Sequence, residues 1–330
     1  MKKVSIVTPC LNGEKFLDRY FNSILLQSYT NLELIFINDG STDKTNDIVK
    51  SFIPYIRDQG IEFKYINKDK NEGLARAIND GIKIFTGDYL IWPDADDFLD
   101  KDSIKKRVEF LEKNKEYGIV RSNANVVNQD NLNIVLNKFE QNPINKEYIF
   151  DDIVSEKLYM CCGCYMIRAS AFLSVNKNRE IYCDNGGQNW QMILPVAYSY
   201  KCGFIDEELY TYVIYKNSHS RNINGLDKII ERNYAHERTL KETLKRIDMD
   251  EDELKRYINR IEERYLKKRF YIAYNYDNKE VMEKNYFELL NRYGVTKEEK
   301  QMYFLKKSRL SNVLIRIYLK LTRILGREND

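Results

Sequence analysis

One pattern occurs four times in the first 100 or so residues: a short apolar run, a polar loop, and a segment with helical spacing of its apolar residues. The apolar runs lie at 4–8, 32–38, 63–66 and 89–92. They lack a strict alternation of apolar and polar residues, which is typical of strands buried on both faces. The pattern therefore predicts an α/β fold, with a mostly parallel sheet and helices on both of its faces.

Each predicted strand ends in a loop rich in Asp, Asn, Thr, Ser or Gly. The four loops lie at 8–13, 39–43, 71–73 and 94–97. The carboxyl ends of parallel strands share one edge of the sheet, and ligands bind in the crevice along that edge. We therefore expect the four loops to converge on one site.

The fourth loop has the most specific chemistry. Asp94, Asp96 and Asp97 place three carboxylates where the predicted strand 89–92 ends. Mg²⁺ and Mn²⁺ prefer oxygen ligands, and one or two carboxylates commonly hold them while substrate phosphates complete the coordination shell. Taken alone, the cluster fits either a divalent-cation site or an acidic turn that caps the next helix.

Composition argues against several other classes of protein. With 53 Lys and Arg against 50 Asp and Glu, the net charge is +3 and gives no general attraction for nucleic acid. No stretch approaches 18 uninterrupted apolar residues, so no membrane-spanning helix is expected. The first residues lack the apolar core of a secretory signal, and we expect a cytoplasmic chain whose domain begins at residue 1.

The six cysteines are expected to be free thiols in a reducing compartment. Cys161 and Cys164 have the C-x-x-C spacing of redox and zinc sites. No second C-x-x-C pair and no His pair follows, and the flanking residues are apolar or aromatic. Packing is therefore the favoured role for these two residues.

From about residue 226 the chain changes character. Pro is absent, and Lys, Arg, Glu, Leu and Tyr recur with helical periodicity, which predicts helices at 226–246, 250–276, 278–293 and 297–326. The segment 304–327, which covers most of the last of these helices, combines seven basic residues with one apolar face. A basic amphipathic helix fits an anionic membrane surface, here the inner face, or packing on its own domain or a partner chain.

Four segments together resemble the family 2 glycosyltransferases of the GT-A fold. They are Val-Ser-Ile-Val-Thr-Pro-Cys-Leu-Asn at 4–12, Ile-Asn-Asp-Gly-Ser-Thr-Asp at 37–43, Asn-Glu-Gly-Leu-Ala at 71–75 with Asn79, and Asp-Ala-Asp-Asp at 94–97. They stand in the family's order and at its usual intervals. The resemblance implies a Rossmann-like domain and inverting transfer of a hexosyl or N-acetylhexosaminyl group from a UDP-linked sugar.

The resemblance covers about residues 3–225 and implies a division of the chain. Residues 1–225 would form the GT-A domain, with 1–100 binding the nucleotide sugar and 101–225 forming the acceptor side. Residues 226–330 would form a helical extension that associates with a membrane or a partner. The acceptor would be a glycan, a lipid-linked sugar or a protein, as in polysaccharide biosynthesis.

The resemblance also assigns residues to the donor and the metal. The base, ribose, diphosphate and sugar would lie against Thr8, Pro9, Asn12, Glu14, Asp39, Asn71, Gly73, Arg76, Asp94 and Arg221. Mn²⁺ or Mg²⁺ would be held by Asp96, Asp94 and His219. His219 and Arg221 are the candidates to replace an Arg and a His that many relatives carry where Val213 and Tyr215 stand here.

The candidate catalytic residues Asp184, Gln188 and Asn189 depart from the family's pattern. Many members carry a Glu-Asp pair where this chain has Gln188 and Asn189. An amide can orient an acceptor hydroxyl but cannot remove its proton. Three possibilities stay open: Asp184 is the base, another carboxylate is, or leaving-group departure dominates. Asp184 is the working hypothesis.

Other classes of function are compatible with part of the pattern. A nucleotidyltransferase also uses paired carboxylates and a metal, but it would be expected to open with a Gly-rich basic loop, which 8–14 lacks. A dinucleotide oxidoreductase would need G-x-G-x-x-G after the first strand. A scaffold that binds the donor and transfers nothing is the remaining alternative, because Asn189 replaces the expected base.

Overall fold

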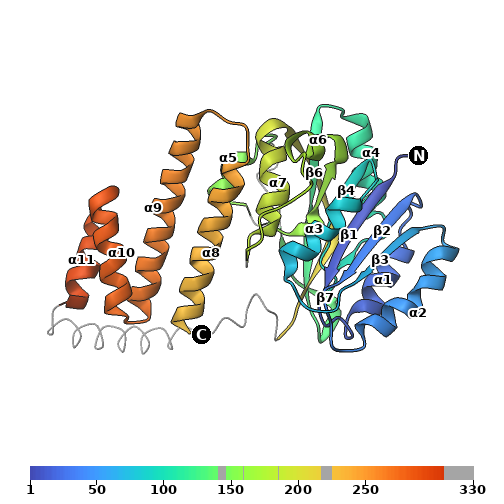
Figure 1. Ribbon diagram of the computed structural model, residues 1–330, viewed down its shortest axis with the longest axis horizontal. Coiled ribbons are helices and arrows are strands. Elements are labelled where there is room, and N and C mark those ends of the chain that lie inside the picture. The colour runs from blue at the N-terminus through green and yellow to red at the C-terminus, as the bar shows by residue number, and fades with distance from the viewer. Residues whose placement is uncertain (140–145, 159, 185, 217–224, 308–330) are drawn as a thin grey trace. The chain divides into compact units, whose positions relative to one another are not determined.

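The computed structural model describes the chain except residues 140–145, 159, 185, 217–224 and 308–330 (Figure 1). The chain divides into two compact units, Met1–Asn222 with Arg238–Leu254, and Ile223–Glu237 with Lys255–Asp330. Helix α8 (Leu226–Lys245) therefore contributes residues to both units. The functional division predicted at residues 100 and 225 stays a prediction.

One sheet forms the centre of the first unit. The described strands have the order β3-β2-β1-β4-β8-β6-β9-β5, and β7 pairs with β6. Their bounds are β1 (Val4–Cys10), β2 (Leu32–Asn38), β3 (Glu62–Asn67), β4 (Tyr89–Ile91), β5 (Phe98–Leu99), β6 (Tyr117–Asn128), β7 (Asn131–Phe139), β8 (Tyr165–Arg168) and β9 (Lys201–Ile214). Strands β3, β2, β1 and β4 are parallel, whereas β8 runs antiparallel to both β4 and β6.

Helices cover both faces of the parallel part. Phe36 and Ile37 are neighbours in β2, so their side chains point to opposite faces. The Phe36 ring lies 5.1 Å from the ring of Phe21 in α1 (Leu17–Leu25). On the other face, a Cβ added at Gly81 of α3 (Leu74–Ile84) would lie 3.0 Å from Ile37 and 2.3 Å from Val7. Helices α1 and α3 therefore lie on opposite faces, and the α/β prediction is confirmed.

Helix α2 (Thr45–Asp58) connects β2 to β3, and the remaining helices of the first unit follow β4. Their bounds are α4 (Ser103–Lys113), α5 (Phe150–Val154), the 3₁₀ helix η1 (Cys162–Cys164), α6 (Ala169–Val175) and α7 (Gln188–Ser199). Strand β9 was not predicted, and its segment 206–208 is entirely acidic. Its pairing with β6 over much of its length makes it a strand.

The second unit is helical, as predicted. Besides α8 it contains most of α9 (Glu251–Asn275), α10 (Lys279–Arg292) and α11 (Lys297–Lys307). The rings of Tyr286 and Tyr303 stack at 4.0 Å in its core. The buried Arg269 donates to Glu237 and Asn285, so its charge is compensated. Of the predicted helix 297–326, the part after Lys307 lies outside the described residues.

Within the described residues, no helix combines the length and the apolar character needed to cross a bilayer.

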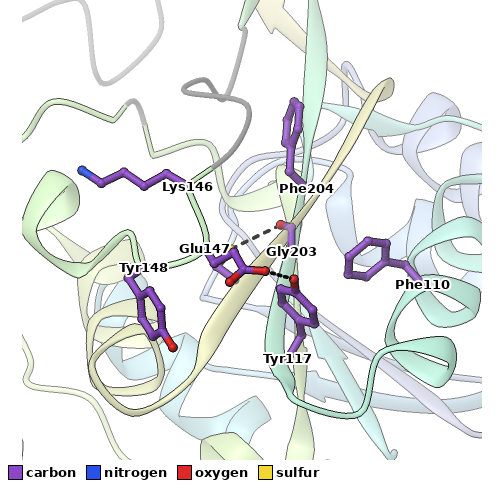
Figure 2. A pocket seen from close by; sticks show the side chains of 8 residues that line it. Phe110, Tyr117, Lys146, Glu147, Tyr148, Gly203 and Phe204 are labelled. Atoms are coloured by element: carbon purple, nitrogen blue, oxygen red, sulfur yellow. Dashed lines mark hydrogen bonds between the residues drawn. The ribbon is translucent and has the colours of Figure 1, made fainter.

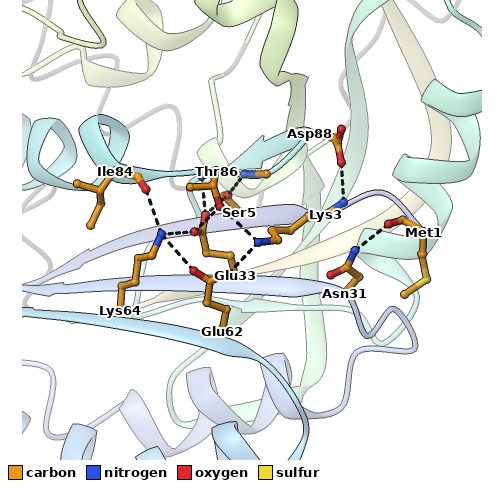
Figure 3. A network of polar contacts seen from close by, with 11 residues as sticks. Met1, Lys3, Ser5, Asn31, Glu33, Glu62, Lys64, Ile84, Thr86 and Asp88 are labelled. Carbon is orange, nitrogen blue, oxygen red and sulfur yellow. Dashed lines mark hydrogen bonds and ion pairs between the residues drawn. The ribbon is translucent and has the colours of Figure 1, made fainter.

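A buried carboxylate joins three strands of the parallel sheet. Glu33 of β2 has no exposed surface, and it accepts hydrogen bonds from Ser5 of β1 and Lys64 of β3. Thr86, which follows α3, donates to the same carboxylate from its amide at 2.9 Å and its hydroxyl at 2.8 Å (Figure 3). Burial opposes ionisation of Glu33, but these donors together lower its pKa.

We expect Glu33→Gln to lower the free energy of unfolding by roughly 2–3 kcal/mol near neutral pH, because Lys64 loses its carboxylate partner. The pKa of Glu33 in the folded chain lies below its value of 4.5 in the unfolded chain. The stabilisation that this carboxylate provides is therefore complete above pH 4.5 and is lost as the pH falls through the folded-state pKa. Urea unfolding at several pH values measures both effects.

The exposed Glu116→Gln serves as the matched control for this substitution and should leave the unfolding midpoint unchanged. A Glu33→Gln variant as stable as the wild type near neutral pH would contradict the role given to this network.

Candidate active site

The carboxylates that follow β4 form a close cluster. Asp94, Asp96 and Asp97 each offer an oxygen, and these oxygens lie within 4.8 Å of one another. Burial raises the pKa of all three groups, and repulsion between neighbouring carboxylates adds to it at Asp96, whose pKa rises to about 7, and at Asp97. A bound cation would offset both effects, because it favours the ionised carboxylate.

The donor set fits a Mg²⁺ or Mn²⁺ ion, which prefers oxygen ligands. Asp94 and Asp96 are half-buried, whereas Asp97 is buried. The Asp97 carboxylate accepts hydrogen bonds from the Val213 amide at 2.8 Å and the Tyr210 hydroxyl at 2.9 Å. Asp97 therefore ties the loop to β9 and does not cap α4. Asp94 and Asp96 remain as the carboxylates that would hold the ion.

The turn Cys162–Cys164 supports this loop. Burial and the neighbouring Asp94 carboxylate both raise the pKa of the Cys162 thiol, so the thiol lies next to this carboxylate. A Cβ added at Gly163 would lie 2.0 Å from the Tyr210 ring, so only glycine lets Tyr210 reach Asp97. All six cysteines are free, as predicted, and Cys161 and Cys164 are buried.

Two residues that the sequence did not single out as ligands or catalysts hold the backbone of Asp96. Arg19 of α1 donates from Nη2 to the Asp96 carbonyl and, at 2.5 Å, to the Tyr215 hydroxyl. The Tyr215 hydroxyl donates to the same carbonyl at 3.1 Å. The sequence signal for Tyr215 was its place in the family's closing segment, where many relatives carry another residue. For Arg19 we find no sequence signal.

The loop after β1 and the loop after β2 are joined by hydrogen bonds. The Asn12 amide donates to Ser41 Oγ at 2.8 Å, and the Thr42 amide donates to Asn12 Oδ1 at 2.9 Å. The Lys44 amide donates to Glu14 Oε2 at 3.2 Å. Asn12 and Glu14 therefore hold the loop after β1 against the loop after β2.

The carboxyl end of β1, which leads into the first of these loops, is more buried than the loops themselves. Thr8 is fully buried, and its hydroxyl shares a hydrogen bond with Tyr20. Pro9, the next residue of β1, is half-buried. Of these two predicted donor contacts, only Pro9 presents side-chain surface.

Asp39 links the second and third loops. Its buried carboxylate accepts hydrogen bonds from the amides of Glu72 at 3.1 Å and Gly73 at 2.9 Å, and it pairs with Lys68 at 2.9 Å. A carboxylate has about four acceptor positions, so roughly one remains for a ligand N–H.

The third loop has a backbone that depends on glycine. Gly73 has a φ of 95°, and its amide also donates to Asn71 Oδ1 at 2.9 Å. Arg76 is exposed one helical turn later, with Nη1 donating to the Glu72 carbonyl at 3.1 Å. Asn71, Gly73 and Arg76 therefore lie at the same edge as Asp39.

The segment expected to contain the base is connected to the acidic loop. Trp92, two residues before Asp94, donates from Nε1 to Asn189 Oδ1 at 3.0 Å. Gln188 Nε2 donates to the Asp184 carbonyl at 3.3 Å. The Asp184 carboxylate accepts two hydrogen bonds from Arg238, at 3.0 and 3.2 Å, and its side chain is 9% exposed.

Some predicted site residues cannot be placed. His219 and Arg221 lie outside the described residues, as does all of 304–327 after Lys307. The predicted roles of the other site residues stay predictions, although their loops meet at one edge of the sheet as expected.

Comparison with known proteins finds the same family across much of the chain. Residues 5–175 match the model for glycosyl transferase family 2. A putative glycosyltransferase, EpsE of Bacillus subtilis, is 31% identical over 184 residues, covering 54% of this chain and 61% of that protein. The chain spans about half the length of the curated relatives that it matches.

Solved glycosyltransferase structures resemble the fold. S. aureus TarS 1–349 in complex with UDP-GlcNAc has a TM-score of 0.59 at 18% identity, over 93% of this chain and 79% of that one. Mannosyltransferase PcManGT from Pyrobaculum calidifontis, in complex with GDP-Man and Mn²⁺, has 0.58 at 15%, over 97% and 80%. The predicted GT-A fold is confirmed. Since the family model matches more than half of its residues, the chain belongs to glycosyl transferase family 2.

Proposed function

We propose that this chain transfers a sugar, with inversion, from a nucleotide diphosphate sugar to a hydroxyl group of a glycan, a lipid-linked sugar or a protein. The carboxylate cluster of Asp94 and Asp96, at the sheet edge where the loops of Asp39 and Gly73 also end, carries the proposal. Neighbours of the same fold bind UDP-GlcNAc or GDP-Man, which supports a nucleotide-sugar donor. A UDP-linked hexose or N-acetylhexosamine is the favoured donor.

Different residues of the site would contribute in different ways to holding the donor. A divalent cation held by Asp94 and Asp96 would neutralise charge on the departing diphosphate. Arg19 and Tyr215 fix the backbone of Asp96, so they orient its carboxylate. Gly73 has no Cβ, and no atom lies within 4 Å of where one would be, so its backbone is open to close approach by the diphosphate.

Asp96→Asn tests the donor site. We expect Mn²⁺-dependent binding of a nucleotide sugar to be lost, and release of nucleoside diphosphate to fall by about 10²–10³-fold. The measurements are calorimetry with Mn²⁺ and UDP-GlcNAc or GDP-Man, and product release over a panel of donors. In metal-free buffer the variant should melt no lower than the wild type, because one repelling carboxylate is gone.

The exposed Asp58→Asn on α2 is the control for Asp96→Asn and should behave as the wild type in both assays. Undiminished Mn²⁺-dependent binding by Asp96→Asn would count against the cation site.

We further propose that Asp184 is the general base for the acceptor hydroxyl, with Gln188 and Asn189 orienting the acceptor. What supports this is its fixed carboxylate, oriented by Arg238, in the segment that Asn189 connects to the end of β4. Removal of the base in such a reaction typically costs 10²–10⁴-fold.

Asp184→Asn should therefore lower kcat by about 10²–10⁴-fold at saturating donor and leave the donor KM unchanged. The nearby exposed Glu180→Gln serves as control. Near-wild-type turnover by a folded Asp184→Asn variant would exclude this base. No nucleoside diphosphate release by the wild type with any acceptor tested would favour the donor-binding scaffold.

We also propose that the basic segment 304–327 binds the anionic inner face of a membrane, which would bring the enzyme to a lipid-linked acceptor. Its seven basic residues and apolar face support this. A chain without 308–330 keeps Tyr303 and the other described residues of the helical core.

This deletion should reduce co-sedimentation with phosphatidylglycerol vesicles several-fold, and added salt should do the same to the full chain. Phosphatidylcholine vesicles provide the control. Equal binding of the truncated chain and the full chain to the anionic vesicles would contradict membrane binding by this segment.

A further inference from the structure

A pocket lies in the first unit, away from the candidate active site. It has a volume of about 540 Å³. Four aromatic side chains contribute to its wall, together with two charged side chains and the start of β9. The lining residues are Phe110, Tyr117, Lys146, Glu147, Tyr148, Cys202, Gly203 and Phe204 (Figure 2).

This pocket and the acidic loop lie at opposite ends of the sheet. Strands β4 and β6 both run antiparallel to β8, so they point the same way. The acidic loop follows the carboxyl end of β4, whereas Tyr117 begins β6 and the pocket residues 202–204 lie near the start of β9. Strand β9 connects the two places, since Val213 binds Asp97. Phe204 pairs with Arg121 and Val213 pairs with Val127, six positions further along β6, while β9 bulges between these two pairs. The two ends of this stretch are therefore about 20 Å apart at ~3.3 Å per residue.

Glu147 organises the pocket. Its carbonyl accepts a hydrogen bond from the Cys202 amide at 2.7 Å, which fixes the segment beside β9. Its carboxylate accepts a hydrogen bond from the Tyr117 hydroxyl (Figure 2). The same carboxylate pairs with Lys201 at 2.9 Å. The Lys201 ammonium lies 5.8 Å from the Tyr117 ring and 5.9 Å from the Tyr148 ring. The Lys201 ammonium therefore lies within about 6 Å of both aromatic rings.

The aromatic rings differ in what they offer a ligand. Phe110 packs edge-on against Tyr117, with ring centroids 5.5 Å apart. A Cβ added at Gly203 would lie 2.1 Å from the Phe110 ring. These rings form a rigid wall. Tyr148 is 62% exposed, so most of its side chain is accessible to a ligand. An exposed aromatic ring beside a hydrogen-bonding rim is the usual composition of a binding site for a partly apolar ligand.

The charges of the pocket favour a neutral ligand. Lys201 is paired with Glu147, and Lys146 is paired with Asp152 at 2.5 Å. These charges cancel, so the pocket offers no net attraction to a phosphate or a nucleic acid. The Glu147 and Lys201 side chains are still 40% and 33% exposed, which leaves an acceptor and a donor at the rim. A saccharide combines hydroxyl groups with apolar C–H faces and matches both features.

Building on the function proposed above, we propose that this pocket binds a neutral oligosaccharide segment of the acceptor or product glycan, remote from the reacting end. The distance along β9 is too long for one sugar to reach both sites. A glycan held here would return to the active site as a tethered ligand, which raises its effective concentration.

The test is binding of four neutral tetrasaccharides (cellotetraose, chitotetraose, maltotetraose and mannotetraose) by calorimetry and ligand-observed NMR. At least one should bind the wild type, and Tyr148→Ala should weaken it by roughly tenfold. Tyr148→Phe keeps the ring and should bind normally. Tyr55→Ala removes a tyrosine that is 64% exposed on α2 and serves as the matched control.

Asp96→Asn separates the two sites, because it should leave tetrasaccharide binding intact. No binding by any tetrasaccharide, full binding by folded Tyr148→Ala, or loss of binding in Asp96→Asn would each overturn the pocket's role. Failure of the proposed function shows itself differently, as absence of nucleoside diphosphate release from nucleotide sugars by the wild type. The melting temperature of each variant reports whether it is folded.

Discussion

Three carboxylates within 4.8 Å of one another repel, and the first unit holds them in place through contacts from several elements. Tyr210 and Val213 of β9 bind Asp97, and the turn at Cys162 supports Asp94. Helix α1 reaches the backbone of Asp96 through Arg19. A cation bound at this cluster would find its site preformed, because the contacts prevent the loop from relaxing the repulsion. Preformed sites bind with less ordering cost than flexible ones.

The proposed donor half and the proposed acceptor half of the site are held by different means. The donor loops are joined mainly by backbone amides that donate to Asp39, Asn12 and Glu14, so their geometry depends on few side chains. The acceptor half depends on Asn189 accepting from Trp92 and on the pair of Asp184 with Arg238. An amide in place of a carboxylate next to the acidic loop also avoids adding a fourth negative charge there.

Strand β9 serves both proposed sites. Its first residues form the wall of the aromatic pocket, and its later residues bind Asp97. Pairing with β6 along its length makes it a stiff element. A glycan bound at the aromatic pocket and a donor at the acidic loop would then keep a fixed separation, which suits an enzyme that extends a chain.

The sequence by itself determined the features that depend on neighbouring residues. The apolar runs that became β1, β2 and β3 and the Asp-Ala-Asp-Asp run are local patterns, so they predicted the α/β fold and the cation candidates. Tertiary structure decided the roles of Arg19, Tyr215 and Tyr210, whose partners lie 77 to 119 residues away. It also decided that 206–208 lies in a strand, because pairing with β6 outweighs local preference. Contacts at such separations depend on the packed fold, and no local pattern encodes them.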